Sequence, residues 1–429
     1  MKTRITYIAV ISLVALNLIL GARVYLESAE AADKDDVYAN IEMFSRVLEM
    51  VRQNYVDGSK VTYEDLINGA MKGMLNTLDP HSEFMDPRKF NDMKSDTAGE
   101  FGGIGVVVTL RSNLMTVIAP MDDTPGSRAG LQAGDQILRI NGQPTERLTL
   151  NDAIEKLRGK AGTDVTITVR RPSTDVVKDH KLTRAVITVK TVRDLNSMGE
   201  YKLLANDIGY VRISTFGDKT NEELEDALKK LTAKNMKGLV IDLRDNPGGL
   251  LDQAVYVAEK FLPVGQLVLT TEGRSLKEKS QHKASGNALK ADLPVALLVN
   301  GGSASASEIV AGCLQDLKRA VLIGEKTFGK GSVQSILPLK GGAALRLTTA
   351  KYYTPSHREI HDKGIMPDHV VPITFDAMRD LMLRRSPGGL EGVPEIERER
   401  IMKTKDTQLD RAIELLSAPP KSTGTKASK

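Results

Sequence analysis

The chain has 429 residues, of which 41% are hydrophobic and 27% charged, and this balance is typical of a globular protein with two or three domains. The 59 basic and 55 acidic side chains are interleaved and leave a net charge of +4, so the clustered basic excess of a nucleic-acid-binding protein is absent and we expect no nucleic-acid partner. With Cys313 as its one cysteine, the chain can form neither an intrachain disulfide nor a cysteine-based metal site.

The first 32 residues are predicted to be a signal peptide or a membrane anchor. Lys2 and Arg4 precede an apolar run from Ile5 to Leu20, as in a signal peptide, and Ala29 and Ala31 supply the small residues of a cleavage site. The run also approaches the length that spans a bilayer, so the segment is either removed or retained as an anchor. A buried N-terminal helix is the remaining alternative. Export predicts a location in the periplasm or at the extracytoplasmic face of the inner membrane.

Residues 36–98 are predicted to be a helical region. Two sets of apolar residues recur at the three-and-four spacing of a helix face, namely Ile41, Phe44, Val47, Leu48 and Val51, and then Leu66, Ala70, Met71, Met74 and Leu75. The second helix is expected to end before Pro80, because proline cannot continue a helix.

Residues 99–190 are predicted to be a compact β-rich module. A glycine loop over Gly102–Gly105 leads into an apolar run, and a later strand ends in an Asn-Gly turn at Asn141. A short amphipathic helix over Leu150–Leu157 and an alternating strand over Val165–Val169 follow. Together these segments resemble a PDZ domain.

A PDZ domain binds the C-terminus of a peptide as an added strand, and loop amides hold the terminal carboxylate. The resemblance therefore implies that Gly103, Ile104 and Gly105 form the carboxylate-binding loop. Considered without the resemblance, these glycines need only make a tight turn.

Residues 191–380 are predicted to be an α/β core, because strands and helices alternate there. Strands are expected over residues 208–213, 238–243, 295–299 and 320–323, and helices over residues 224–231 and 307–317. The uninterrupted apolar run from Val295 to Val299 is typical of a strand that is covered on both faces of its sheet.

Residues 381–429 hold one amphipathic segment, Leu409–Leu416, and a polar tail from Pro419 that is predicted to be disordered. The helical segments at both ends of the chain have apolar faces left over, and a homodimer built from them would cover these faces. The predicted fold class is a multidomain α/β protein, in which an α/β core carries an inserted β-rich PDZ domain and helical segments at both termini.

The segment Asn300–Glu308 is the main candidate for catalysis. Its Gly, Ser and Ala residues lie between a predicted strand and a predicted helix, where small residues allow a sharp turn and the close approach of a substrate. The free N–H groups of the following helix favour negative charge at the turn. A serine held there could attack a carbonyl group while backbone amides receive the oxyanion. The alternative is that a serine, best suited Ser307, is only a helix N-cap.

No histidine stands out as the base for such a serine. The six histidines are His81, His180, His282, His357, His361 and His369, and no serine has a Gly-x-Ser-x-Gly motif around it. Lys330 lies between two glycines after a predicted core strand, where the chain can run close to a neighbouring loop. A free lysine has a pKa of about 10.4, and burial beside apolar groups can lower it by the roughly 3 units that a base at pH 7 needs. Gln334 could orient the amine without adding charge. Otherwise Lys330 is a surface lysine in a glycine-rich loop.

The segments Ser303–Glu308 and Thr327–Gly331 resemble the signatures of the C-terminal processing peptidases, or tail-specific proteases, which are Ser/Lys-dyad enzymes with an embedded PDZ domain. Leu78–Ser82, Asp242–Gly249 and Lys363–Asp368 extend the resemblance, which covers about residues 40–375. The sequence departs from the family at His357, where glycine is frequent.

The resemblance implies a serine endopeptidase that recognises and cleaves protein substrates near their C-termini. It implies that Ser305 is the nucleophile that forms an acyl-enzyme, that Lys330 is the general base and that Gln334 assists it. The amides of Gly249 and Ala306 would form the oxyanion hole. Such a mechanism needs neither a metal nor an organic cofactor.

Two other functions compete with this interpretation. His357 and His361 have the spacing of a zinc-protease motif, but Arg358 stands where that motif needs glutamate. The other alternative is an exported PDZ scaffold whose α/β domain only binds peptides, in which case Ser305 and Lys330 would be expendable.

Overall fold

The computed structural model describes residues 37–111, 114–121, 123–275, 278–286, 293–386, 388–390 and 393–418. The predicted signal peptide or anchor, residues 1–32, and the tail from Pro419 lie outside the described residues. Within these described ranges, no helix combines the length and the apolar composition of a membrane-spanning segment. The chain divides into two compact units, residues 1–84 and residues 85–429.

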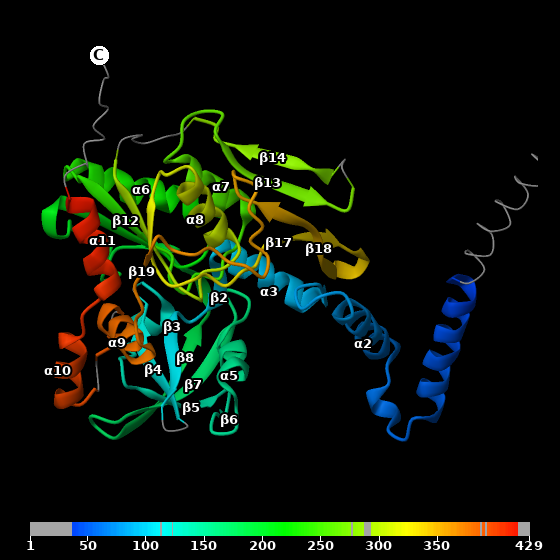
Figure 1. Ribbon diagram of the computed structural model, residues 1–429. Coiled ribbons are helices and arrows are strands. Elements are labelled where there is room, and N and C mark those ends of the chain that lie inside the picture. The colour runs from blue at the N-terminus through cyan, green and yellow to red at the C-terminus, as the bar shows by residue number, and fades with distance from the viewer. Residues whose placement is uncertain are drawn as a thin grey trace, which may run out of the picture. The chain divides into compact units, whose positions relative to one another are not determined.

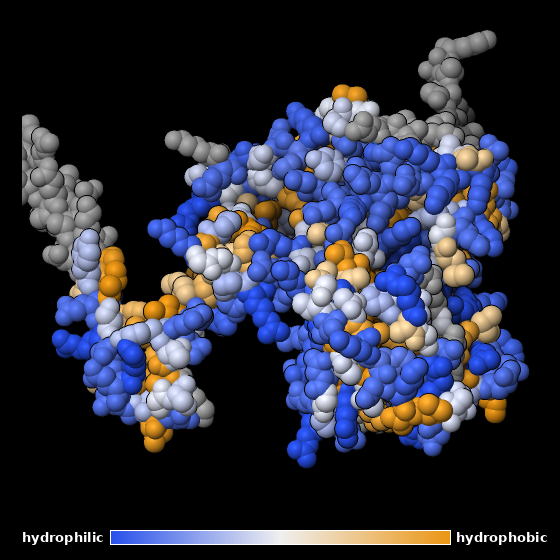
Figure 2. Space-filling view, turned by 180° about the vertical axis from the view of Figure 1, so that it is seen from behind, coloured by the Kyte–Doolittle hydropathy of each residue, from blue (hydrophilic) through white to orange (hydrophobic). Residues whose placement is uncertain are grey.

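The first unit is helical. It contains a helix over residues 37–54, the 3-10 helix η1 (Gly58–Lys60) and α2 (Tyr63–Asn76). Thr62 is the N-cap of α2, because its hydroxyl oxygen accepts a hydrogen bond from the amide of Asp65 at 3.1 Å. Of the apolar set expected in α2, only Leu75 is buried. Exposed apolar side chains gather on the helix over residues 37–54 (Figure 2), namely Val37, Tyr38, Ile41, Met43, Phe44, Val47, Met50 and Val51.

α3 lies near the start of the second unit, within the helical region that was predicted over residues 36–98. β1 (Glu83–Met85) spans the division between the units, and α3 (Pro87–Ala98) follows it. α3 starts where the Asp86 side chain accepts a hydrogen bond from the amide of Lys89 at 2.9 Å. It ends at Gly99, whose φ of 66° is a left-handed conformation that glycine adopts readily. Local capping signals therefore set both ends of this helix.

Residues 106–183 form an antiparallel sheet in the order β3-β4-β5-β7-β8, in which β3 and β8 are the edge strands. Its strands are β3 (Val106–Arg111), β4 (Leu114–Pro120), β5 (Gln136–Ile140), β7 (Asp164–Arg171) and β8 (Val176–Thr183), and β6 (Gln143–Pro144) pairs with β5. Alternate residues of β7 (Val165, Ile167 and Val169) point into an apolar core that α5 (Leu150–Leu157) also covers. The predicted β-rich module and its helix are therefore present.

Two smaller elements complete this module. α4 (Pro125–Arg128) lies between β4 and β5, and β2 (Glu100–Gly103) pairs with β9 (Ala185–Thr188) in a separate antiparallel ribbon. α5 begins with a capping box, in which Thr149 and Asp152 each bond to the backbone amide of the other.

The core of the second unit is a sheet in the order β10-β11-β12-β15-β16-β19, and all its pairs are parallel except that of β10 with β11. Its strands are β10 (Val192–Arg193), β11 (Ile208–Ile213), β12 (Gly238–Asp242), β15 (Val295–Val299), β16 (Val321–Gly324) and β19 (His369–Val370). β12 and β15 are buried at every position, as the continuous apolar run in β15 predicted.

Helices cover both faces of this sheet (Figure 1). They are α6 (Thr220–Ala233), α7 (Leu251–Glu259) and α8 (Ala306–Asp316) on one face, and α11 (Thr407–Ser417) on the other. Alternation along β15 produces the two layers, because Leu297 faces the first group and Leu298 faces α11. The predicted α/β fold with a β-rich insertion and helical termini is therefore confirmed.

An antiparallel sheet and two further helices complete the second unit, and the sequence reasoning named none of these elements. The strands pair in the order β17-β18-β13-β14, and they are β13 (Leu267–Gly273), β14 (Ser280–Lys283), β17 (Ser332–Pro338) and β18 (Ala344–Tyr353). The helices are α9 (Phe375–Arg385) and α10 (Glu395–Lys403), and η2 (Ala205–Asp207) and η4 (Lys340–Gly342) are short 3-10 turns.

Candidate active site

Loops at the C-terminal ends of four neighbouring parallel strands meet around a pocket of about 670 Å³. β11, β12, β15 and β16 end at this edge of the core sheet, which is where α/β proteins bind ligands. The pocket is lined by all five residues that were assigned to catalysis or to the oxyanion hole, namely Gly249, Ser305, Ala306, Lys330 and Gln334. The fold thus brings together residues that lie far apart in the chain.

The three serines of the glycine- and serine-rich segment have different surroundings. Ser303 Oγ donates a hydrogen bond to the carbonyl of Leu243 at 2.8 Å, and Ser303 is fully buried. Ser307 Oγ donates to the carbonyl of Asn246 at 2.9 Å and is also fully buried. Ser305 is half-buried and lines the pocket. Of the three, only Ser305 is therefore placed to meet a substrate.

The backbone of Ser305 adopts an unusual conformation. Its φ of 55° and ψ of −114° are rare for a residue that carries a side chain, and such conformations concentrate at functional sites. Ser305 occupies the N-cap position of α8, so the alternative in which Ser307 is the N-cap is wrong. The turn places Ser305 where the free N–H groups of the first helical turn and the helix dipole favour negative charge.

Lys330 lies in a loop that packs closely against a neighbouring loop, as its two flanking glycines predicted. A Cβ atom on Gly331 would lie 2.4 Å from the amide nitrogen of His361, and Gly329 has a φ of 97°. The amide of Lys330 donates a hydrogen bond to the Glu308 carboxylate at 2.9 Å. Its carbonyl accepts a hydrogen bond from the buried Tyr352 hydroxyl. The backbone of the lysine is therefore held on both sides.

The amides of Gly249 and Ala306 are placed to donate to a ligand in the pocket. Gly249 forms a parallel bridge with Phe216, in which the bonds are made by the Phe216 amide to Gly248 and by the Leu250 amide to Phe216. The N–H group of Gly249 consequently points away from Phe216. Within the part of the chain that the structure describes, neither the Gly249 amide nor the Ala306 amide has a hydrogen-bond acceptor.

Close contacts require glycine at positions 248 and 249, in the loop after β12. A Cβ atom on Gly248 would lie 2.8 Å from the Cβ atom of Ser305, and one on Gly249 would lie 2.2 Å from the carbonyl oxygen of Phe216. Only a residue without a side chain allows the two loops to approach this closely.

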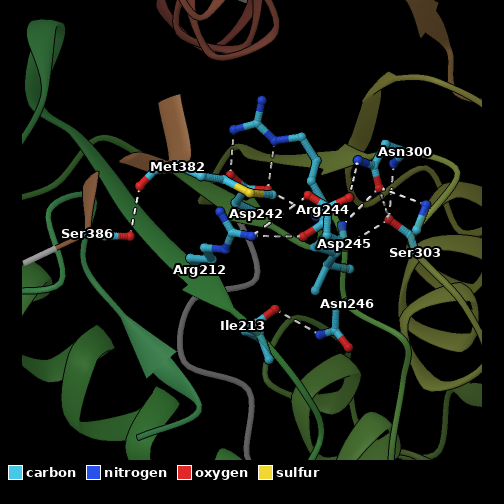
Figure 3. Close-up of polar contacts among 12 residues, drawn as sticks. Arg212, Ile213, Asp242, Arg244, Asp245, Asn246, Asn300, Ser303, Met382 and Ser386 are labelled. Atoms are coloured by element: carbon cyan, nitrogen blue, oxygen red, sulfur yellow. Dashed lines mark hydrogen bonds and ion pairs between the residues drawn. The ribbon is translucent and has the colours of Figure 1, made fainter. Parts of the chain in front are cut away.

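Hydrogen bonds join the loop after β12 to the loop after β15 (Figure 3). The Asn300 side chain accepts from the amide of Asp245 at 2.9 Å and donates to its carboxylate at 2.8 Å. The Asn246 carbonyl accepts from the amide of Ala304 at 3.0 Å, and its side chain donates to the Ile213 carbonyl at 2.8 Å. The loop that carries Gly249 and the loop that carries Ser305 therefore form one hydrogen-bonded unit.

Arg244 links this unit to the C-terminal helix. Its guanidinium is fully buried and bonds to Asp242 at 2.6 Å, Asp406 at 2.9 Å and Gln408 at 3.0 Å. Burial alone would raise the pKa of the Asp242 and Asp406 carboxyls, but the charge and hydrogen bonds of Arg244 outweigh it and hold both pKa values below their ordinary range. Figure 3 shows Arg244 and Asp242 beside Asp245.

Gln334 and Tyr352 form part of the pocket wall. Gln334 lies on β17, and its amide donates to the Ser332 hydroxyl at 2.9 Å and to the Thr348 hydroxyl at 3.4 Å. Burial and the nearby Glu308 charge raise the pKa of Tyr352 well above its ordinary value, although a hydrogen bond with the Ser305 side chain opposes this rise. The Tyr352 hydroxyl therefore stays protonated beside the candidate nucleophile.

The predicted carboxylate-binding loop lies between β2 and β3. Gly103 ends β2, Ile104 is buried, and Gly105 has a φ of 69° with Thr124 in the space that a Cβ atom would fill. The tight turn therefore requires glycine at Gly105. The strand that follows, β3, lies at the edge of its sheet, so one side of it is open for the addition of a peptide strand.

The zinc-protease alternative concerns the segment around His357 and His361. Among the described residues, no three His, Cys, Asp or Glu side chains form a group that could hold a metal ion. His357 stacks on Tyr353 and its Nε2 lies 3.1 Å from a carboxylate oxygen of Glu272.

Neither Glu308 nor Tyr352 was predicted to have a role in the site. Glu308 follows Ser305 by three residues, and this Ser-x-x-Glu spacing before an apolar run is the signal of a capping box. It was available in the sequence as a clue to the start of α8. No local signal marks Tyr352, because only the pairing of β18 brings it to the pocket.

Models of three known families match the chain. Peptidase family S41 matches residues 207–371, the PDZ domain matches residues 116–171, and the activating protease CtpB N-terminal domain matches residues 16–89. The PDZ match lies inside the predicted module and confirms it.

Curated relatives agree with these matches. A carboxy-terminal-processing protease of Bartonella bacilliformis is 45% identical over 355 residues, which cover 81% of this chain and 79% of that protein. A carboxyl-terminal-processing protease of Synechocystis sp. is 36% identical over 382 residues, which cover 83% and 86%. The photosystem II D1 C-terminal processing protease is 28% identical with a TM-score of 0.44, and the match covers 77% of this chain and 92% of that one.

The S41 match includes all three loops that carry Gly249, Ser305 and Lys330. The match to the Bartonella protein extends over about four-fifths of both chains. The chain therefore belongs to the carboxy-terminal processing proteases, which are serine peptidases of family S41.

Proposed function

We propose that this chain is an exported serine endopeptidase that cleaves protein substrates near their C-termini, with Ser305 as nucleophile and Lys330 as general base. The observation that carries the proposal is the different placement of the three serines. Ser303 and Ser307 are buried with their hydroxyls bonded to carbonyl groups, whereas Ser305 lines a pocket together with Lys330.

The acylation step follows from these positions. Neutral Lys330 takes the proton of the Ser305 hydroxyl as Oγ attacks the carbonyl carbon of the scissile bond. The carbonyl oxygen becomes an oxyanion. The N–H groups of Gly249 and Ala306, which have no acceptor among the described residues, stabilise it. The lysine then gives its proton to the departing amine, and the C-terminal fragment leaves. Water, activated by the same lysine, hydrolyses the acyl-enzyme. These reaction steps require no metal or organic cofactor.

Gln334 lies on the pocket wall and supplies a neutral amide rather than a charge. A carboxylate at that position would stabilise the lysine ammonium and raise its pKa, which would oppose its use as a base. We assign Gln334 the orientation of the lysine amine in the reacting complex.

The PDZ domain captures the substrate C-terminus in this proposal, with Gly103, Ile104 and Gly105 as its carboxylate loop. The open edge of β3 directly after this loop supports this assignment. The N-terminal segment exports the protein to the periplasm or to the extracytoplasmic face of the inner membrane, either as a signal peptide or as an anchor. The exposed apolar side chains on the helix over residues 37–54 support a homodimer built from the terminal helical segments.

The substitution Ser305→Ala tests the proposal. Full-length variant protein is incubated with an unfolded reporter protein, and the products are identified by mass spectrometry. We expect cleavage to be lost while binding of C-terminal peptides is kept. Ser307→Ala is the matched control, since it removes a buried hydroxyl two residues away that takes no part in the proposed chemistry. Cleavage by Ser305→Ala at the wild-type rate would show that the chain uses another nucleophile, and peptide binding without cleavage by the wild type would show that it is a scaffold.

A further inference from the structure

Glu308 is a buried carboxylate in the first turn of α8, and nothing in the proposed chemistry uses it. Its exposed fraction is 0%. A buried carboxylate is costly unless hydrogen bonds satisfy it, so the bonding partners of Glu308 indicate why it is kept.

Four donors satisfy this carboxylate, and they come from two different loops. Oε2 accepts from the amide of Ser305 and from the amide of Lys330, both at 2.9 Å. Oε1 accepts from the Thr327 hydroxyl at 2.6 Å and from the amide of Gly329 at 2.8 Å. One oxygen therefore bonds at once to the backbone of the candidate nucleophile and to the backbone of the candidate base.

These bonds are stronger than ordinary backbone bonds for two reasons. Hydrogen bonds to an ionised acceptor are roughly twice as strong as neutral ones. The position of Glu308 in the first turn of α8 also places its charge at the positive end of the helix dipole. A shift of the lysine loop away from the nucleophile turn breaks bonds to a buried charge, and the free-energy cost of that shift is correspondingly high.

The bond to the Ser305 amide has a further consequence. Ser305 has a φ of 55°, and a strained conformation persists only where surrounding contacts determine it. Glu308 supplies one such contact at the strained residue itself, and it does so with the same oxygen that holds Lys330.

We infer that Glu308 is a positioning residue, which fixes the Lys330 loop against the Ser305 turn through one shared carboxylate oxygen. The inference rests on the proposed roles of Ser305 and Lys330. A displacement of about 1 Å between reacting groups can reduce a rate about a hundredfold, so the loss of this bridge reduces kcat strongly without removing either reacting group.

Glu308→Gln tests the inference in the full-length protein. The amide retains the shape of the side chain, but its NH₂ group faces an N–H donor whichever oxygen it replaces. At least one bond is therefore lost, and both bonds to the shared oxygen are lost when NH₂ replaces Oε2. We expect kcat to fall about a hundredfold while KM for a labelled unfolded reporter changes less than about threefold.

Asp194→Asn is the matched control for the general cost of losing a buried carboxylate. Asp194 is buried and accepts from the amides of Met198 at 2.8 Å, Glu200 at 2.9 Å and Tyr201 at 3.2 Å, but it does not line the pocket. Both variants are expected to unfold at a lower temperature than the wild type, and only Glu308→Gln is expected to lose kcat. An equal loss of kcat in the two variants, or none in Glu308→Gln, overturns the inference.

Variants of Thr327 provide a second test, which applies also if Glu308→Gln does not fold. Its hydroxyl donates to Glu308 and accepts from the amide of Ile365 at 2.6 Å. We expect Thr327→Val to lose kcat and Thr327→Ser to retain it, because only serine keeps both bonds. Equal kcat in these two variants also overturns the inference. Failure of the proposed function is distinguishable, since Ser305→Ala would then remain active whatever Glu308→Gln does.

Discussion

Asp406 connects α11 to the loop that carries Gly249, and Asp406→Ala measures what this connection contributes to stability. Its carboxylate accepts from the buried Arg244 guanidinium at 2.9 and 3.0 Å, from Arg385 at 2.8 Å and from the amide of Leu409 at 3.0 Å. The substitution removes all four acceptor contacts at once. It also leaves Arg244 with Asp242 as its remaining carboxylate partner.

The magnitude follows from the kinds of bonds that are lost. Removal of one partner from a buried ion pair costs about 3–5 kcal/mol, and the lower figure applies because Arg244 keeps Asp242. Loss of the N-cap of α11 adds about 1 kcal/mol. We therefore expect the free energy of unfolding to fall by about 4 kcal/mol, which corresponds to a decrease of about 8–16 °C in the midpoint of thermal unfolding of the core.

Urea and thermal unfolding, followed by circular dichroism, check this value. Asp410→Ala is the matched control, because Asp410 is an exposed carboxylate on the same helix. The control should lie within about 0.5 kcal/mol of the wild type. If Asp406→Ala also stays within that margin, the buried cluster around Arg244 does not stabilise the fold in the way that its contacts indicate.

Three further predictions concern the same region. Gly249→Ala should lower kcat by at least about a hundredfold with little change in KM. The added Cβ would lie 2.2 Å from the Phe216 carbonyl oxygen, so the loop must shift and move the oxyanion-binding amide. An unchanged kcat in steady-state kinetics would contradict this role. With Lys330 as base, kcat/KM should rise with pH through an apparent pKa below the value of about 10.4 for free lysine, and a chelator should have no effect; a flat profile from about pH 5 to 10 would count against the lysine. The pKa values of Asp242 and Asp406 are lowered in the folded protein, so these carboxylates contribute stability above their unfolded-state pKa of 3.8. This stability is lost as the pH falls below that value. The urea midpoint should therefore fall steeply on acidification, and more steeply for the wild type than for Asp406→Ala.

Much of the core sheet could be predicted from the sequence, because its strands and helices carry strong local patterns. The run Val295–Val299 is apolar throughout and forms the central strand β15. The helix that contains Leu224 and Leu228 is α6, and both residues are buried as their spacing predicted. The β17–β18 hairpin was not predicted, since most of its residues are half-buried and its apolar pattern is weak.

The sequence by itself predicted the kind of chemistry that we propose for the chain. Ser305 in a small-residue turn before a helix, and Lys330 between two glycines, are local patterns with a physical meaning, and the resemblance to a known family joined them. The choice of Ser305 over Ser303 and Ser307 as nucleophile came from that resemblance, and the fold gives it a physical basis by burying the other two hydroxyls against backbone carbonyls.

The tertiary structure alone decided which distant residues meet. Tyr352 reaches the pocket through the pairing of β18, Arg244 bonds to Asp406 across 162 positions of the chain, and Glu308 bonds to both the Ser305 turn and the Lys330 loop. The reason is physical: a sequence pattern records the period and capping of one element. The partners of a buried charge are fixed only when several elements pack together and exclude water from it.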